Sequence, residues 1–159
     1  MALTHLDEDG RPSMVDVGKK EITSRTAHAQ AIVDLPEIVS CQLSDDEIHS
    51  PKGPVFSTAI LAGIQAAKKT PDLIPLCHTV PLNDATICVT PNENARELKV
   101  DCKVSACHQT GVEMEALTGA TIAALTIYDM TKALSRDVVI RSVRLMEKTG
   151  GKQDFRREN

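Results

Sequence analysis

The order of the elements expected along the chain favours a ferredoxin-like α+β fold. Strand, helix, strand, strand, helix, strand is the split βαβ pattern of that fold. Alternating apolar and polar residues mark the strands, and longer apolar segments with helical spacing mark the two long helices. We therefore expect an antiparallel four-stranded sheet with both long helices on one face. Because the other face of the sheet also needs cover, we expect an oligomer.

The 159 residues are enough for a single domain with a sizeable core. We expect an N-terminal arm at 1–21, one ferredoxin-like domain at 22–149 and a flexible C-terminal tail at 150–159. The expected elements, in chain order, are a strand at 22–35, a short helix from Pro36, an acidic loop at 42–51, a helix at 55–70, a rigid loop at 71–83, hairpin strands at 85–90 and 96–107, a helix at 111–132 and a last strand at 138–148.

The predicted helix at 111–132 carries charged residues at both ends of an apolar segment. Glu113 and Glu115 stand near its start, and Asp129 and Lys132 near its end. Glu115 and Asp129 would lie about 21 Å apart along a helix, so they cannot meet around one small reacting group within one chain. If both ends serve one site, two chains must contribute to it. The simpler alternative is capped helix ends, with an Asp129–Lys132 salt bridge, and the helix alone favours that alternative.

Three other positions leave a structural and a functional interpretation open. Arg25, on the small-residue face of the first strand, is either an edge arginine that reaches water or an anion contact. Lys52, just before the predicted helix at 55–70, is either solvated or part of an anion site at the helix N-terminus. His78 follows Cys77 in a proline-rich loop and is either a general acid or base or a structural histidine.

Composition argues against several classes of protein. The net charge of −4 disfavours general nucleic-acid or membrane-surface binding, and 2% aromatic residues disfavour single-strand binding by stacking. No apolar segment approaches the length of a membrane span. Five cysteines without a CxxC pair, and no signal-peptide pattern at the start, lead us to expect reduced thiols and a cytoplasmic protein. The Cys-His dipeptides at 77–78 and 107–108 lack zinc-site spacing, so we expect no metal.

Seven segments together resemble the cyclic pyranopterin monophosphate synthase family, whose members catalyse the second step of molybdenum cofactor biosynthesis. They are MVDV at 14–17, KxxTxRxAxA from Lys20 to Ala29, AGIQAAKKT at 62–70, DLIPLCH at 72–78, TGVEMEALT at 110–118, LTIYDMTKA at 125–133 and VRLMEKTGGK at 143–152. The similarity runs almost from end to end, in the order and spacing of the family.

The resemblance implies an assembly and a reaction. It implies a homohexamer, a trimer of dimers, with the active site at the dimer interface. The implied substrate is a 3′,8-cyclised dihydroguanosine triphosphate made from GTP and handed on by the preceding radical enzyme. The implied products are cyclic pyranopterin monophosphate and pyrophosphate, and no metal or organic cofactor is expected.

The resemblance also assigns roles to residues of this chain. The implied catalytic acids and bases are Asp129, Lys132, Lys52, His78, Glu113 and Glu115. The implied substrate-binding residues are Leu76, Cys77, His78, Met114 and Glu115, of which Leu76, Cys77 and Met114 would form pocket walls. Arg25, Lys20, Lys68, Lys148 and Lys152 are candidate triphosphate contacts.

Two positions depart from the family pattern beside these residues. Thr79-Val80 precede Pro81-Leu82 where Pro-Leu commonly follows Cys-His directly, and Pro54 stands where an acidic residue commonly follows Lys-Gly. Both departures bear on loop geometry more than on chemistry. The alternative functions are a non-catalytic nucleotide- or pterin-binding regulatory module and an assembly scaffold. Neither needs so many titratable groups.

Overall fold

The computed structural model describes residues 9–158. The expected N-terminal arm and C-terminal tail therefore include residues, 1–8 and 159, that lie outside the described part of the chain. No helix within residues 9–158 is long and apolar enough to cross a membrane.

The main sheet confirms the predicted topology. Its strands, in spatial order, are β5 (Asp84–Pro91), β6 (Glu97–His108), β1 (Thr23–Asp34), β7 (Val139–Thr149) and β8 (Phe155–Arg156). Every neighbouring pair is antiparallel. The first and last strands of the βαββαβ order, β1 and β7, pair with each other. On its other side β1 pairs with β6, as the ferredoxin-like order requires.

The short strand β8 is a correction to the four-stranded sheet that the sequence predicts. It lies in the segment expected to be a flexible tail and pairs with β7 at Lys148 and Glu147. The backbone N–H of Arg157 donates to the carbonyl of Met146 at 2.7 Å. This part of the tail is therefore held against the edge of the sheet.

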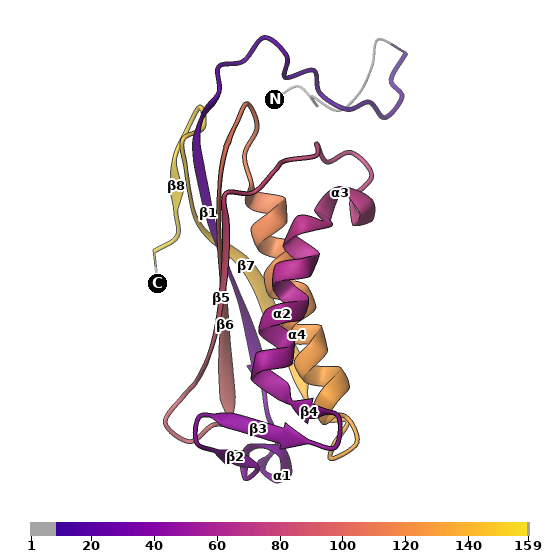
Figure 1. Ribbon diagram of the computed structural model, residues 1–159, viewed down its shortest axis with the longest axis vertical. Coiled ribbons are helices and arrows are strands. Elements are labelled where there is room, and N and C mark those ends of the chain that lie inside the picture. Colours follow the sequence, from indigo (N-terminus) through magenta and orange to yellow (C-terminus); the bar gives the residue numbers. More distant parts are fainter. Residues whose placement is uncertain (1–8, 159) are drawn as a thin grey trace.

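The two long helices, α2 (Val55–Lys68) and α4 (Glu113–Thr131), lie together on one face of the sheet (Figure 1). Two four-residue helices, α1 (Glu37–Ser40) and α3 (Thr70–Leu73), complete the helical part. The acidic loop expected at 42–51 is instead part of a small sheet of β2 (Leu43–Ser44), β3 (Glu47–Ser50) and β4 (Gly53–Pro54). Its short strands alternate too briefly for the period to show in the sequence.

The core lies between the sheet and the two helices. Ala27, Ala29 and Ala31 of β1 are buried, as are Leu98 and Val100 of β6, in the alternation expected from the sequence. Small side chains on the central strand let α4 pack closely over the sheet. The buried core is aliphatic apart from Phe56.

The opposite face of the sheet is polar. The ring of His28 on β1 lies 2.7 Å from the carboxylate of Asp101 on β6, which also accepts a hydrogen bond from Gln30 at 2.9 Å. No helix of the described residues covers this face in Figure 1. The single chain leaves this face open, and its contact with another copy of the chain stays a prediction.

Candidate active site

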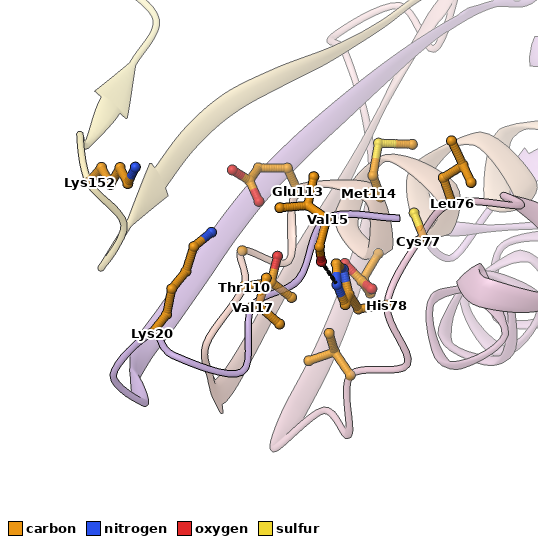
Figure 2. Close-up of a pocket in the computed structure, with 13 residues that line it drawn as sticks. Val15, Val17, Lys20, Leu76, Cys77, His78, Thr110, Glu113, Met114 and Lys152 are labelled. Atoms are coloured by element: carbon orange, nitrogen blue, oxygen red, sulfur yellow. Dashed lines mark hydrogen bonds between the residues drawn. The ribbon is translucent and has the colours of Figure 1, made fainter. Parts of the chain in front are cut away.

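A cavity of about 500 Å³ opens where the N-terminal arm, the loop after α3 and the start of α4 meet. Eight of the predicted site residues line this cavity, namely Lys20, Leu76, Cys77, His78, Glu113, Met114, Glu115 and Lys152. In Figure 2, Lys20 and Lys152 lie at one end of this cavity, and Leu76, Cys77 and Met114 at the other. The cavity therefore has a cationic end and a more apolar end.

A second cavity of about 270 Å³ adjoins the first at its cationic end. The two share Lys20, Glu113 and Lys152, and the second adds Arg25 and Lys148. Four cationic side chains thus surround connected space in a chain whose net charge is −4. Such a concentration of positive charge suits an anion.

The cations of the second cavity are held in place by neighbouring groups. Arg25 donates from Nε to the carbonyl of His108 at 3.2 Å and from Nη2 to that of Gln109 at 3.3 Å. Lys148 Nζ lies 2.8 Å from Glu113 Oε1, and both side chains are partly exposed. Arg25 is therefore fixed by the loop before α4 and does not extend into water as an unattached edge residue.

The N-terminal arm orients His78. Its Nε2 lies 2.7 Å from the carbonyl oxygen of Val15, and Figure 2 shows the bond at the cavity wall. A carbonyl oxygen only accepts, so Nε2 carries the proton that it donates. In the neutral ring Nδ1 is then the nitrogen that accepts a proton.

Glu115 is a buried carboxyl group at the cavity wall. Its residue is 3% exposed. Burial, with a smaller contribution from the charge of Glu113, raises the pKa of Glu115 from 4.5 to about 7. Burial and the charge of Glu115 also raise the pKa of the Cys77 thiol. A carboxyl that titrates near neutral pH can both give and take a proton, which suits general acid–base catalysis.

A separate cationic and acidic cluster lies at the far end of α4. Asp129 Oδ2 is 2.7 Å from Lys52 Nζ, and its Oδ1 is 2.6 Å from Lys132 Nζ. Lys52 Nζ also donates to the backbone carbonyl of Asp129 at 3.2 Å. Hydrogen bonds from Lys132 and Lys52 lower the pKa of Asp129 to about 2. The cluster is open, with each of the three side chains about half exposed.

The structure thus divides the predicted site residues into two sets at opposite ends of α4 (Figure 1). Glu113 and Glu115 lie at its start, beside the cavities, and Asp129 lies near its end, about 21 Å away along the helix axis. Lys68 belongs to neither set. It is exposed in the last turn of α2 and lines neither cavity.

Several cavity residues were not among the predicted site residues. Val15 and Val17 of the arm line the larger cavity, and Gln109, Thr110 and Gly111 line one or both. The apolar pair at 15 and 17 inside a polar arm is the sequence signal that marks a segment packed against the domain. Residues 109–111 carry no comparable sequence signal, because they belong to the cavity wall through their place in the fold and not through a characteristic side chain.

No group of three or more His, Cys, Asp or Glu residues within 9–158 is arranged to hold a metal ion. The five cysteines are unpaired and lie at separate positions, namely Cys41, Cys77, Cys88, Cys102 and Cys107.

A model of the MoaC family matches residues 14–151. The chain belongs to the MoaC family. Among MoaC-related proteins, a cyclic pyranopterin monophosphate synthase of Xanthomonas campestris pv. campestris is 47% identical over 96% of this chain and 92% of its own length. The family match covers the arm from Met14 onward and every residue of both site sets except Lys152, which follows directly after its end.

Two longer relatives also match this MoaC-family chain. A molybdenum cofactor biosynthesis bifunctional protein of Synechocystis is 49% identical over 95% of the chain, and molybdenum cofactor biosynthesis protein 1 of Dictyostelium discoideum is 49% identical over 94%. The chain spans 44% of the first protein and 26% of the second. In those relatives the MoaC-like part is one portion of a larger protein.

Proposed function

We propose that this chain is a cyclic pyranopterin monophosphate synthase. It converts a 3′,8-cyclised dihydroguanosine triphosphate into cyclic pyranopterin monophosphate and releases pyrophosphate, within molybdenum cofactor biosynthesis. The observation that carries the proposal is the paired arrangement of a cationic cavity with buried and half-buried carboxyl groups beside it. The similarity to the Xanthomonas synthase over nearly both whole chains supports it.

The cavities suit the two parts of this substrate. Arg25, Lys20, Lys148 and Lys152 would hold the triphosphate, and Leu76, Cys77 and Met114 would flank the base. Lys68 would contribute only if the bound triphosphate or another chain reaches beyond the two cavities. Phosphate oxygens are strong acceptors, so guanidinium and ammonium groups recognise them well.

The chemistry requires several proton transfers. The base-derived ring opens with water and closes again as a pterin, which needs protons given to and taken from nitrogen and oxygen. A ribose hydroxyl attacks the α-phosphorus, the bond from that phosphorus to the bridging oxygen breaks, and pyrophosphate leaves. Glu115, Glu113 and His78 at the cavity, and the Lys52–Asp129–Lys132 cluster, would supply the acids and bases for these steps.

We also propose that one active site is built by two chains. The cavity of one protomer would face the Lys52–Asp129–Lys132 cluster of its partner, because the two sets lie too far apart in one chain to share one substrate. A trimer of such dimers would form the hexamer. The preceding radical enzyme would supply the substrate, and we place the reaction in the cytoplasm, where unpaired cysteines are usual.

The test is pyrophosphate release by mixtures of inactive variants. Asp129→Asn and His78→Asn should each lose roughly 10²- to 10⁴-fold in rate, the usual cost of a proton-transfer group. Their mixture should recover about a quarter of wild-type activity, because about half the dimers are mixed and each has one intact site. The matched control is Asp129→Asn mixed with Lys52→Ala, which should stay inactive because both residues belong to one cluster.

Three outcomes would count against these proposals. No recovery in the first mixture, with subunit exchange shown by native mass spectrometry, would place the whole site in one chain. Binding of the substrate by the wild type without pyrophosphate release would favour the regulatory module. No binding at all would favour an assembly scaffold.

A further inference from the structure

Lys52 lies in a short turn between two strands. Contacts other than the Lys52–Asp129 ion pair have to hold this turn in position. The turn joins β3 to β4, and α2 begins directly after β4. Pro54 is the N-cap of α2 and provides no side-chain cap, and the first turn of α2 contains no acidic residue. The N–H groups at the start of this helix therefore need an acceptor from elsewhere.

Glu47, the first residue of β3, supplies that acceptor. Its Oε1 accepts from the N–H of Phe56 at 2.7 Å, and its Oε2 accepts from the N–H and the hydroxyl of Ser57, both at 3.0 Å. Phe56 and Ser57 are the second and third residues of α2, the donors that an N-cap side chain usually serves. Burial acts to raise the pKa of Glu47, but the hydrogen bonds from Phe56 and Ser57 outweigh it and lower the pKa.

The same contact closes a loop around Lys52. Glu47 stands before the turn and Phe56 after it, so their hydrogen bond joins the two sides. Inside the turn, Ser50 Oγ accepts from the N–H of Lys52 at 3.1 Å and donates to the carbonyl of Gly53 at 3.2 Å. From this turn Lys52 Nζ reaches Asp129, 77 positions further along the chain.

We infer that Glu47 is a positioning residue for Lys52. By fastening the strand before Lys52 to the helix after it, Glu47 holds the ammonium group against Asp129 and keeps the Lys52–Asp129–Lys132 cluster assembled. This role rests on the proposed function for its effect on turnover, but the placement of Lys52 can be measured without turnover.

The experiment compares Glu47→Ala with the wild type in three ways, at a temperature well below both melting temperatures. The first is labelling of Lys52 by acetic anhydride, read by mass spectrometry against Lys69 as an internal standard. The second is the melting temperature, and the third is kcat and KM for pyrophosphate release. Val104→Ala is the control for a general loss of stability, because Val104 is a buried residue of β6 that lines neither cavity and is not part of the Lys52–Asp129–Lys132 cluster.

Labelling of Lys52 should rise about two- to fivefold in Glu47→Ala. This is the change in the free ammonium population expected when an exposed ion pair is lost. The kcat should fall about 10- to 100-fold, the usual cost of a misplaced group, with KM nearly unchanged. Val104→Ala should lower the melting temperature and leave both Lys52 labelling and kcat near wild type. If Glu47→Ala lowers the melting temperature without changing labelling or kcat, Glu47 is only a helix cap and the inference is wrong.

A second variant separates capping from positioning. In Glu47→Ala/Pro54→Asp, an acidic N-cap serves α2 directly but does not join β3 to the helix. The melting temperature should recover while Lys52 labelling stays high and kcat stays low. Recovery of all three would overturn the positioning role. If the wild type releases no pyrophosphate and Lys52 labelling still responds to Glu47→Ala, the proposed function fails while the contact network stands.

Discussion

The carboxyl group of Glu115 shows how one buried side chain changes the chemistry available at a site. The group is nearly inaccessible, and burial shifts its titration toward neutral pH. Glu113, two positions earlier, is paired with Lys148 and stays partly exposed. Two carboxyl groups of one helical turn therefore stand in different surroundings, one buried and one paired with a lysine.

The raised pKa of Glu115 predicts a pH dependence of stability. Between about pH 4.5 and 7 the folded chain binds more protons at this group than the unfolded chain, so the free energy of unfolding falls as pH rises. The stabilisation is complete below pH 4.5 and is lost as pH rises through 7. In Glu115→Gln, the free energy of unfolding should fall less over this pH range, by roughly 1–3 kcal/mol in total. Urea unfolding at several pH values measures this free energy.

Glu93→Gln is the control for that measurement, because Glu93 is exposed in the loop between β5 and β6. Its pH profile should match that of the wild type. A Glu115→Gln profile that also matches the wild type would mean that Glu115 is as easily ionised in the folded chain as in water.

The crossing of α2 and α4 depends on two glycines. A Cβ at Gly63 would lie 2.8 Å from the carbonyl oxygen of Gly119 and 2.2 Å from Ile87 Cδ1. A Cβ at Gly119 would lie 2.6 Å from Cys102 Sγ. This close approach sets the distance of α4 from the sheet, and with it the place of both ends of α4.

Gly63→Ala should destabilise the domain by roughly 1–3 kcal/mol, because the added methyl group meets backbone as well as side chain. The better helix propensity of alanine, about 1 kcal/mol, offsets only part of this cost. Thermal or urea unfolding measures the change. Thr121→Ala on the exposed side of α4 is the control and should stay within about 0.5 kcal/mol of wild type. A stabilised Gly63→Ala would mean that the helices can separate freely.

The turn after β7 shapes the cationic cavity through Gly150. This residue has φ of 83°, and a Cβ there would lie 1.8 Å from the carbonyl oxygen of Ser24. Its own carbonyl accepts a hydrogen bond from Thr23 at 2.9 Å. The turn lies between Lys148 and Lys152 in the chain, and both of these residues line the cavity together with Arg25.

Gly150→Ala should raise KM for the cyclised triphosphate by about tenfold or more, because a displaced turn moves cations away from the phosphates. Steady-state pyrophosphate release measures KM. Gly10→Ala is the matched control, since Gly10 also has a positive φ, of 75°, but a Cβ there would meet nothing within 4 Å and the residue lines neither cavity. Equal effects of the two substitutions would mean that the close approach of Gly150 to Ser24 is unimportant for the cavity.

The local charge around the cavities is opposite in sign to the net charge of the chain. The protein carries −4 overall, yet Lys20, Arg25, Lys148 and Lys152 surround connected cavities. An acidic protein can therefore attract a triphosphate locally while its remaining surface repels other polyanions. This is the arrangement that a small anionic substrate needs and that a general nucleic-acid binder does not have.

The cavity charges predict a salt dependence of substrate binding. Raising ionic strength from about 0.05 M to about 0.5 M should increase KM roughly 3- to 10-fold, because added ions screen partly exposed charges. Lys152→Gln should make the dependence less steep. Lys69→Gln, which removes the same charge from a side chain that lines neither cavity, should leave it unchanged. A KM independent of salt in the wild type would contradict phosphate binding by these four residues.

The main elements and the fold class were predictable because they depend on local periodicity. Alternation in β1 and β6, and the long apolar segment of α4, are properties of neighbouring residues and survive without knowledge of the rest of the chain. The small sheet of β2, β3 and β4 and the edge strand β8 were not predictable. Strands of two to four residues are too short to show a period, and distant pairing partners stabilise them.

The residue types of the candidate site were visible in the sequence, together with the separation of Glu115 from Asp129, because a helix has a fixed rise per residue. Only tertiary structure brings Lys52 to Asp129, joins the arm to His78 and buries Glu115. Those contacts link positions tens of residues apart, and the burial that shifts a pKa comes from side chains packed around the group. Local sequence specifies the groups and their elements, and packing decides their neighbours and their charge.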